Sequence, residues 1–252
     1  MRAGLLEPAK WADVAAGLGL DGVSISAQAQ SMSGTFAPFV SAAKCAEACR
    51  VYLAAGVTPH LMLWPRPDLG HARALVDYVT DVFAACPDLA SVDLDAEEQW
   101  TRSPLRSGSG QRVARFIGDS WPTRLLLAVN GITAALPRIL DLVRIAGVLW
   151  PQAYTANKPS QTGTPGKRQE EVFARWRAEA HDSQTINMGL AAYDQEGAGG
   201  LSADQAMARA YNAAAIRVEA IRYWSLQELA GGKDAAFVRE RCAEIRAARG
   251  HA

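Results

Sequence analysis

Short apolar segments typical of buried strands alternate along the chain with longer segments that have the periodicity of amphipathic helices. The strand candidates are Gly22–Ser26, Pro59–Trp64, Ala90–Glu97, Arg124–Asn130, Gly147–Tyr154, Thr185–Tyr193 and Ile221–Leu226, with a shorter one at Ala3–Leu6. The helix candidates are Lys10–Leu18, Ala42–Ala55, Ala72–Ala85, Gln111–Ser120, Ala134–Arg144, Gln169–Ala180, Ser202–Ala214 and Asp234–Arg249. This alternation predicts a parallel sheet with helices outside it.

The number of strand candidates favours a closed barrel. With Ala3–Leu6 as the first strand there are eight, which is the number that a (β/α)8 TIM barrel needs. We therefore predict an α/β fold in which one barrel domain spans residues 1–252 and its first strand is incomplete or atypical. An open sheet is the alternative. The loops expected at Thr101–Gly110 and Asn157–Lys167 follow strands, so they should lie on the functional rim.

Composition restricts the partners that we expect. The chain has 252 residues, 49% hydrophobic, and 26 basic residues balance 26 acidic ones, so nothing indicates nucleic acid or a membrane surface as a partner. Four cysteines without a Cys-x-x-Cys pair and four histidines predict neither a metal site nor a cofactor. The start of the chain lacks the apolar region of a signal peptide, so we expect a cytoplasmic protein, with export or release by lysis as its route outward. The oligomeric state is left open.

One strand carries three acidic residues on one side. In the segment from Ser91 to Glu97, alternation places Asp93, Asp95 and Glu97 on the inner face of the barrel, at a spacing of about 6.6 Å. Like charges in such an interior raise one another's pKa, so one carboxyl should retain a proton near neutral pH. A neutral acid at a strand end is what a glycosidase uses to protonate a leaving oxygen, and Glu97 is the outermost. The alternative is a set of solvated acids paired with basic residues, and Glu98 is a second candidate for the acid.

Three short motifs together resemble glycoside hydrolase family 18, the chitinases and chitinase/lysozymes. Asp93-Leu-Asp95-Ala-Glu97 is similar to the family's Asp-x-Asp-x-Glu core, whose acid ends the fourth barrel strand. Gln152-Ala-Tyr154 resembles the Gln-x-Tyr of the small plant-type enzymes on the sixth strand, and Trp224 lies on the expected eighth. The family usually has another Asp where this chain has Ala90. The muramidases of family 25, which also carry Asp-x-Glu, are a second resemblance.

The resemblance implies a role for each of these residues. The enzyme would be a retaining glycoside hydrolase acting on a polysaccharide of N-acetylated amino sugars, chitin or peptidoglycan, in which the substrate's own acetamido oxygen is the nucleophile. Glu97 would be the acid and base, Asp95 would orient the acetamido group, and Asp93 would tune Asp95. Tyr154 would hydrogen-bond the acetamido carbonyl. The residues expected to contact the sugars are Gln152, Trp224 and Asp194, with Trp64, Trp100 and Trp150 on the rim.

Two other functions fit the same sequence. A barrel with two catalytic carboxylates would pair Glu97 with Asp194 or Glu196, although Ala96 stands where such enzymes usually have Asn. Family 18 barrels can also be sugar-binding proteins without catalysis, but those have lost the acid that Glu97 represents. The Gly-rich segment before Ser202 could bind a phosphate at a helix N-terminus, and an ordinary helix cap explains it better.

Overall fold

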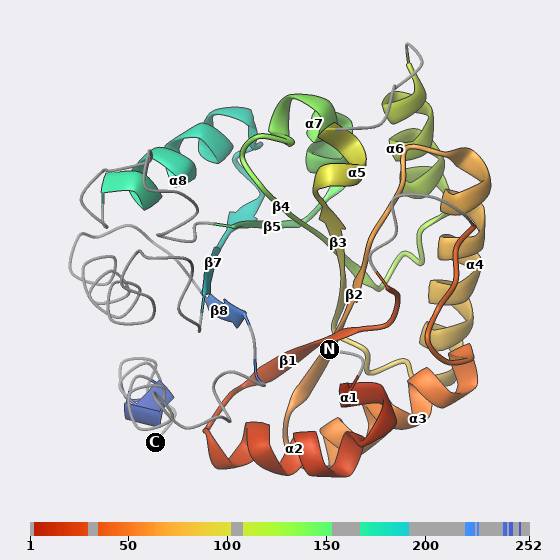
Figure 1. Ribbon diagram of the computed structural model, residues 1–252, viewed down its shortest axis with the longest axis vertical. Helices are drawn as coiled ribbons and strands as arrows, with labels where there is room; N and C mark the ends of the chain where they lie inside the picture. Colours follow the sequence, from red (N-terminus) through yellow and green to blue (C-terminus); the bar gives the residue numbers. More distant parts are fainter. Residues whose placement is uncertain are drawn as a thin grey trace.

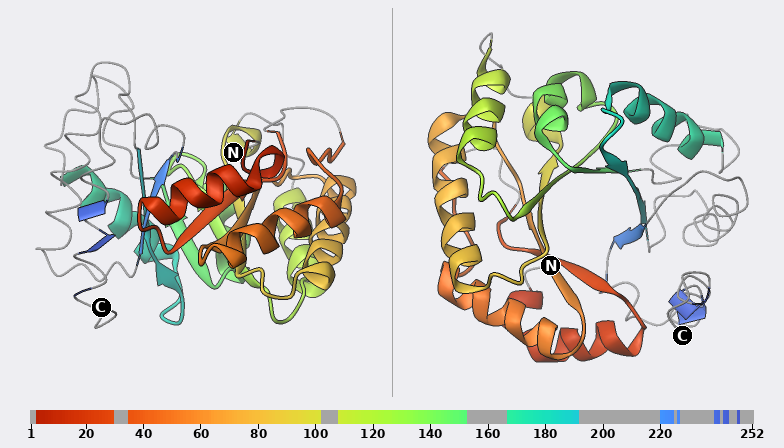
Figure 2. Two further views of the ribbon diagram at one scale, coloured as in Figure 1. Left: turned by 90° about the horizontal axis from the view of Figure 1, so that it is seen from below. Right: turned by 180° about the vertical axis from the view of Figure 1, so that it is seen from behind.

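The computed structural model describes residues 3–29, 35–101, 108–152, 167–191, 220–224, 226, 239–240, 242–243 and 247. Within these residues, parallel strands form a curved inner wall and helices lie outside it (Figure 1). The view from behind shows the same two layers (Figure 2). The chain thus has the (β/α)-barrel fold that the alternating pattern predicts, with the carboxyl ends of the strands at one rim.

The strands follow one another around the barrel in chain order. Their bounds are β1 (Gly22–Ser26), β2 (Thr58–Leu63), β3 (Ser91–Ala96), β4 (Leu126–Gly131), β5 (Val148–Pro151), β6 (Thr185–Ile186), β7 (Met188–Ala191) and β8 (Ile221–Trp224). The strands β1 to β6 form one parallel sheet in sequence order, and β7 pairs with β8 in a second sheet. A single bridge between Gln152 and Gly189 joins the two sheets.

The helices alternate with the strands and pack against one another around the outside. Their bounds are α1 (Ala3–Leu6), α2 (Pro8–Gly17), α3 (Ala42–Ala54), α4 (Leu69–Ala85), α5 (Glu98–Thr101), α6 (Ser109–Ser120), α7 (Leu136–Ile145) and α8 (Lys167–Glu179). The expected helix at Ser202–Ala214 lies outside the described residues, as does most of Asp234–Arg249. No helix in the part of the chain that the structure describes is both long and apolar enough to cross a membrane.

Side-chain caps mark where two of the longer helices begin. The Ser41 hydroxyl accepts a hydrogen bond from the backbone N–H of Lys44 at 3.4 Å, and a carboxylate oxygen of Asp68 accepts one from His71 at 2.8 Å. Both side chains satisfy N–H groups that have no partner within the helix. The Asp68 cap starts α4 at Leu69, three residues earlier than the apolar periodicity predicted.

The prediction of a first strand at Ala3–Leu6 is wrong, because these residues form helix α1. Pro8 opens α2 and disfavours an extended pairing strand at this point. Gly4 also lies against helix α3, where its carbonyl accepts a hydrogen bond from the Tyr52 hydroxyl at 3.3 Å. The strand with the three acids is therefore β3, the third strand in chain order and not the fourth.

The strand expected at Thr185–Tyr193 is interrupted at Asn187. The Asn187 side-chain oxygen accepts a hydrogen bond from the backbone N–H of Ala220 at 3.0 Å, and its own N–H donates to Leu149 at 2.9 Å. The side chain thus takes the place of a backbone acceptor at the point where pairing passes from β5 to β8. The strands β6 and β7 occupy one position in the barrel wall.

The two faces of the sheet differ in polarity. Val92, Leu94 and Ala96 of β3 are fully buried and belong to the apolar core between sheet and helices, together with Trp176 of α8. The opposite face of the same strand carries Asp93 and Asp95, also buried. The main core therefore lies outside the strands, and the barrel interior is available for polar chemistry.

Gly131 lies where strands β3 and β4 approach closely. A Cβ atom there would lie 2.8 Å from the backbone oxygen of Ala96, which cannot move without displacing β3. We expect Gly131→Ala to lower the free energy of unfolding by about 1–3 kcal/mol, measured by urea denaturation followed by tryptophan fluorescence. Gly17→Ala is the matched control, because a Cβ atom at that helical position meets no atom within 4 Å. An unchanged free energy of unfolding in Gly131→Ala would show that the backbone of β3 moves to make room for the added Cβ atom.

Candidate active site

Asp93 and Asp95 of β3 and Glu97, directly after it, point into the barrel as the alternation predicts. Asp93 and Asp95 are 0% and 3% exposed, whereas Glu97, directly after the strand, is half-buried. In register, Asp95 lies beside Asn130 of β4, which lies beside Trp150 of β5. These side chains thus share one layer near the carboxyl ends of the strands, where barrel enzymes have their sites.

Asp93 is held by an ion pair that crosses the barrel. Its Oδ2 lies 2.8 Å from Nη2 of Arg222 on β8 and accepts a second hydrogen bond, also 2.8 Å, from the Ser24 hydroxyl on β1. The Ser91 hydroxyl donates to Oδ1 at 3.4 Å, and the His60 ring nitrogen Nδ1 lies 2.8 Å from that same hydroxyl. Because Ser91 donates its proton to Asp93, His60 Nδ1 is assigned as the donor to Ser91.

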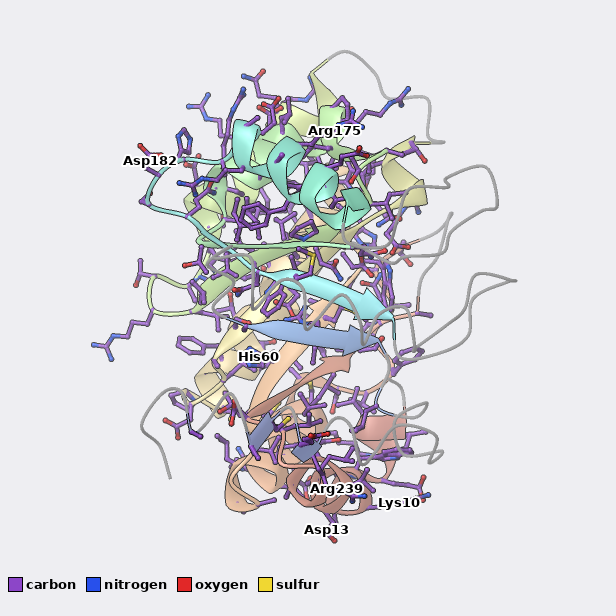
Figure 3. All side chains as sticks on the ribbon, turned by 90° about the vertical axis from the view of Figure 1, so that its left-hand side faces the viewer. Lys10, Asp13, His60, Arg175, Asp182 and Arg239 are labelled. Atoms are coloured by element: carbon purple, nitrogen blue, oxygen red, sulfur yellow. The ribbon has the colours of Figure 1, made fainter. Side chains whose placement is uncertain are left out.

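His60 belongs to β2, behind β7 and β8 in the side view of Figure 3. Burial lowers the pKa of its imidazole, and the charge of Arg222 acts in the same direction, while Asp93 opposes both. The neutral ring is therefore favoured. It contributes a hydrogen bond to the network and no compensating charge for the acids, so Arg222 is the cation that balances Asp93.

Asp95, Glu97 and Gln152 form the second polar group, closer to the rim. The amide nitrogen of Gln152 donates to Asp95 Oδ1 at 3.1 Å and to Glu97 Oε1 at 2.5 Å. Burial raises the pKa of Asp95 well above its usual range, the charge of Glu97 adds to this effect, and Arg222 partly opposes it. Of the three acids, Asp95 is thus the carboxyl whose surroundings favour retention of a proton.

The residues directly after Glu97 form helix α5, which includes Thr101, the first residue of the loop expected at Thr101–Gly110. Gln99 is buried and donates through its amide nitrogen to the backbone oxygens of Asp95 at 2.7 Å and Pro65 at 3.3 Å. The indole N–H of Trp100 donates to the same Pro65 oxygen at 2.9 Å, and the Trp100 side chain is 0% exposed. Both ring faces of Trp100 are covered by protein, so the prediction that it contacts a sugar at the rim is wrong.

The other two rim tryptophans differ in their surroundings. Trp64, directly after β2, is 8% exposed, and its indole nitrogen is buried without a hydrogen-bond partner. Trp150 is half-buried, and the guanidinium carbon of Arg222 lies 4.1 Å from its ring centroid. That contact is a cation–π interaction and occupies one ring face of Trp150. A sugar could reach only the other face.

Several predicted site residues lie outside the part of the chain that the structure describes. They are Tyr154, Asp194 and Glu196. The backbone of Trp224 is placed on β8, two residues after Arg222, and its side chain is outside the described set, as is that of Glu98. The structure therefore brings together Asp93, Asp95, Glu97 and Gln152 from the predicted site and leaves the remaining members as predictions.

Arg222 is absent from the site predicted from the sequence, although the sequence contains a signal for it. Arg222 precedes Trp224 by two positions, so the side-chain period of two predicts the same face of the strand for both. If Trp224 faces the barrel interior, the same alternation predicts that the Arg222 cation faces the acids. Ser24 and His60 carry a weaker signal, because single polar residues occur at many strand positions. Among the described residues, no group of three His, Cys, Asp or Glu side chains is arranged to hold a metal ion.

The pKa of Asp95 gives a test of its burial. A raised pKa means that the folded protein binds a proton that the unfolded chain has released, so stability falls as pH rises. We expect Asp95→Asn to gain stability over the wild-type protein above about pH 4, by about 1.4 kcal/mol per pH unit until Asp95 ionises in the folded state. Urea denaturation between pH 4 and 8 measures this difference. Asp13→Asn at an exposed position of α2 is the control. Parallel curves of unfolding free energy against pH for Asp95→Asn and the wild-type protein would contradict a raised pKa of Asp95.

Comparison with known proteins shows the fold. No family model matches the chain, and no curated protein matches it. A solved xylanase and α-amylase inhibitor protein in complex with trehalose is 13% identical, with 90% of this chain and 92% of that chain covered and a TM-score of 0.64. A β-glucosidase is 13% identical over 89% and 78% of the chains, with a TM-score of 0.60. A family 5 glycoside hydrolase from Bifidobacterium longum subsp. infantis is 9% identical over 89% and 66%, with a TM-score of 0.65.

The chain therefore shares the TIM-barrel fold of glycoside hydrolases and of an inhibitor protein whose solved complex contains a sugar. Identities of 9–13% carry no activity from those proteins to this one. The activity therefore has to be inferred from the residues of the site.

Proposed function

We propose that the protein is a retaining glycoside hydrolase in which Glu97 is the general acid and base. The observation that carries this proposal is the arrangement of Asp95, Glu97 and Gln152 at the carboxyl end of the barrel. A buried carboxyl that favours its protonated form lies beside a more exposed carboxyl, and one amide nitrogen donates to both. Acids with different surroundings at a strand end are what protonation of a glycosidic oxygen requires.

The proposed substrate is a β-1,4-linked polymer of N-acetylated amino sugars, chitin or peptidoglycan. In the first step the acetamido oxygen attacks the anomeric carbon, the glycosidic bond breaks, and Glu97 gives its proton to the leaving oxygen. In the second step Glu97 removes a proton from water, which attacks the same carbon and reopens the ring formed by the acetamido group. The proton that Glu97 donates is the single proton of the Asp95–Glu97 pair, so Asp95 is ionised once the bond has broken. In that form Asp95 orients the acetamido N–H and stabilises the positive charge that develops.

The spacing of the motifs around the barrel supports this assignment. One strand position, β4, separates β3 with Asp93, Asp95 and Glu97 from β5, and Gln152 directly follows β5. One position, formed by β6 and β7, separates β5 from β8 with Trp224. The family 18 pattern on strands four, six and eight has the same spacing. Loss of the first strand shifts every motif by one position and leaves their mutual placement unchanged.

The central test is Glu97→Gln. We expect turnover of N-acetylglucosamine oligomers to fall by about 10²–10⁴-fold, because the amide cannot transfer a proton, while binding of the oligomers is retained. Release of reducing ends measures the first quantity and isothermal titration calorimetry the second. Glu47→Gln on the outer helix α3 is the matched control and should behave as the wild-type protein. Full activity of Glu97→Gln would exclude Glu97 as the acid.

The two-carboxylate mechanism makes a different prediction. If the acetamido group is the nucleophile, Asp194→Ala and Glu196→Ala should each retain turnover within about tenfold of the wild-type rate, since losing a catalytic carboxylate costs at least about 10². A thiazoline analogue of the cyclised sugar should inhibit competitively. Loss of turnover in one of these two variants, with binding intact, would favour that residue as the nucleophile.

A sugar-binding protein without catalysis is the second candidate function. It is favoured by the fold shared with an inhibitor protein solved with trehalose and by the hydrogen bond from Gln152, which leaves Glu97 Oε1 as an acceptor. For catalysis, the proton must be carried on the other oxygen or come from Asp95. Oligosaccharide binding without release of reducing ends during long incubation would identify this function.

A further inference from the structure

We propose that Arg222 is a positioning residue for the Asp95–Glu97 pair, holding Asp93 as a neutralised anion so that this pair keeps a single proton. The inference deepens the proposed function and rests on it for its meaning in catalysis. The ion pair and its electrostatic effect are properties of the protein whether or not it hydrolyses a sugar.

Arg222 is held by one nitrogen of its guanidinium group and by one face of that group. Nη2 lies 2.8 Å from Asp93 Oδ2, and the guanidinium carbon lies 4.1 Å from the ring centroid of Trp150. The Arg222 side chain is 15% exposed and the Asp93 side chain 0%. Its Nη1 atom is buried and has no hydrogen-bond partner. The side chain therefore gives up hydration on one side to reach a carboxylate on a distant strand.

Stability alone does not explain this arrangement. Taking two charges out of water costs about as much as their attraction returns, and buried ion pairs can often be replaced by apolar residues of similar volume without loss. The neighbouring apolar face of β3 shows that the strand readily accepts such residues at Val92 and Leu94. A charged pair in this position is better explained by its effect on its neighbours.

The network that Arg222 joins contains these charged or titratable groups among the described residues: His60 from β2, Asp93 and Asp95 from β3, Glu97 directly after β3, and Arg222 from β8. The strands β1, β4 and β5 contribute neutral side chains there, namely Ser24, Asn130, Trp150 and Gln152.

The charges around Asp95 and Glu97 determine how many protons these two carboxyls hold. The charge of Arg222 cancels that of Asp93, and burial disfavours a positive His60. Asp95 and Glu97 together can then hold one proton and one negative charge. Without Arg222, the charge of Asp93 would act on Asp95 unopposed, and the pair would ionise only at higher pH. The proposed chemistry requires the singly protonated pair, because one group donates the proton while the other stabilises positive charge.

The experiment compares Arg222→Met, Asp93→Asn and the double variant with the wild-type protein. The side-chain carboxyl signals of 13C-labelled Asp and Glu are followed by NMR from pH 3 to 9, together with the pH dependence of kcat/KM. We expect Arg222→Met to move the titration midpoint of the Asp95–Glu97 pair upward by about one pH unit and Asp93→Asn to move it downward. The double variant should return close to the wild-type midpoint.

These directions distinguish positioning from a merely structural role. A structural ion pair would reduce the amount of folded protein in both single variants. In the protein that remains folded, the titration midpoint of the Asp95–Glu97 pair would be unchanged, and that result would overturn the inference. If Arg222→Met does not fold, Asp93→Asn and the double variant still test it, because they must differ in midpoint. Movement of the midpoints without any glycoside hydrolysis would refute the proposed function and support the inference.

Discussion

The buried ion pair between Asp93 and Arg222 allows three acids to occupy one face of a single strand. Without a cation, the interior of this barrel would hold neighbouring negative charges in a medium that solvates them poorly. Arg222 reaches Asp93 from β8 at 2.8 Å, and Ser24 donates to the same oxygen. The innermost acid is thereby satisfied by partners on two other strands, β1 and β8. The outer two are then free to differ in protonation, which is the property that the proposed chemistry uses.

The sequence predicted the architecture well because it is encoded locally. The strand at Gly22–Ser26 has the predicted bounds, and most other elements differ from prediction by a few residues. Alternation alone placed Asp93 and Asp95 inside the barrel, since the side-chain period of two follows directly from strand geometry. The failure at Ala3–Leu6 has a physical cause, because four apolar residues before a proline fit a short helix as well as a strand.

The partners of the site residues were harder to predict than their positions. Arg222 lies 129 positions after Asp93 in the chain, and the two meet because β3 and β8 both line the barrel interior. The burial of Trp100 depends on a hydrogen bond to Pro65, a contact between the ends of two neighbouring strands that no periodicity encodes. Interactions of this kind are set by tertiary structure. They decide which carboxyl is neutral and which tryptophan face is open.

Helix α5 has a consequence for how this barrel can change. Gln99 and Trp100 both donate to the carbonyl oxygen of Pro65, and Gln99 also donates to that of Asp95. These hydrogen bonds from α5 join the carboxyl ends of β2 and β3 directly after Glu97. The acid is thus anchored by hydrogen bonds of its own strand end and of the neighbouring one. Changes elsewhere around the barrel can therefore alter which ligand it selects while Glu97 stays in register with Asp95.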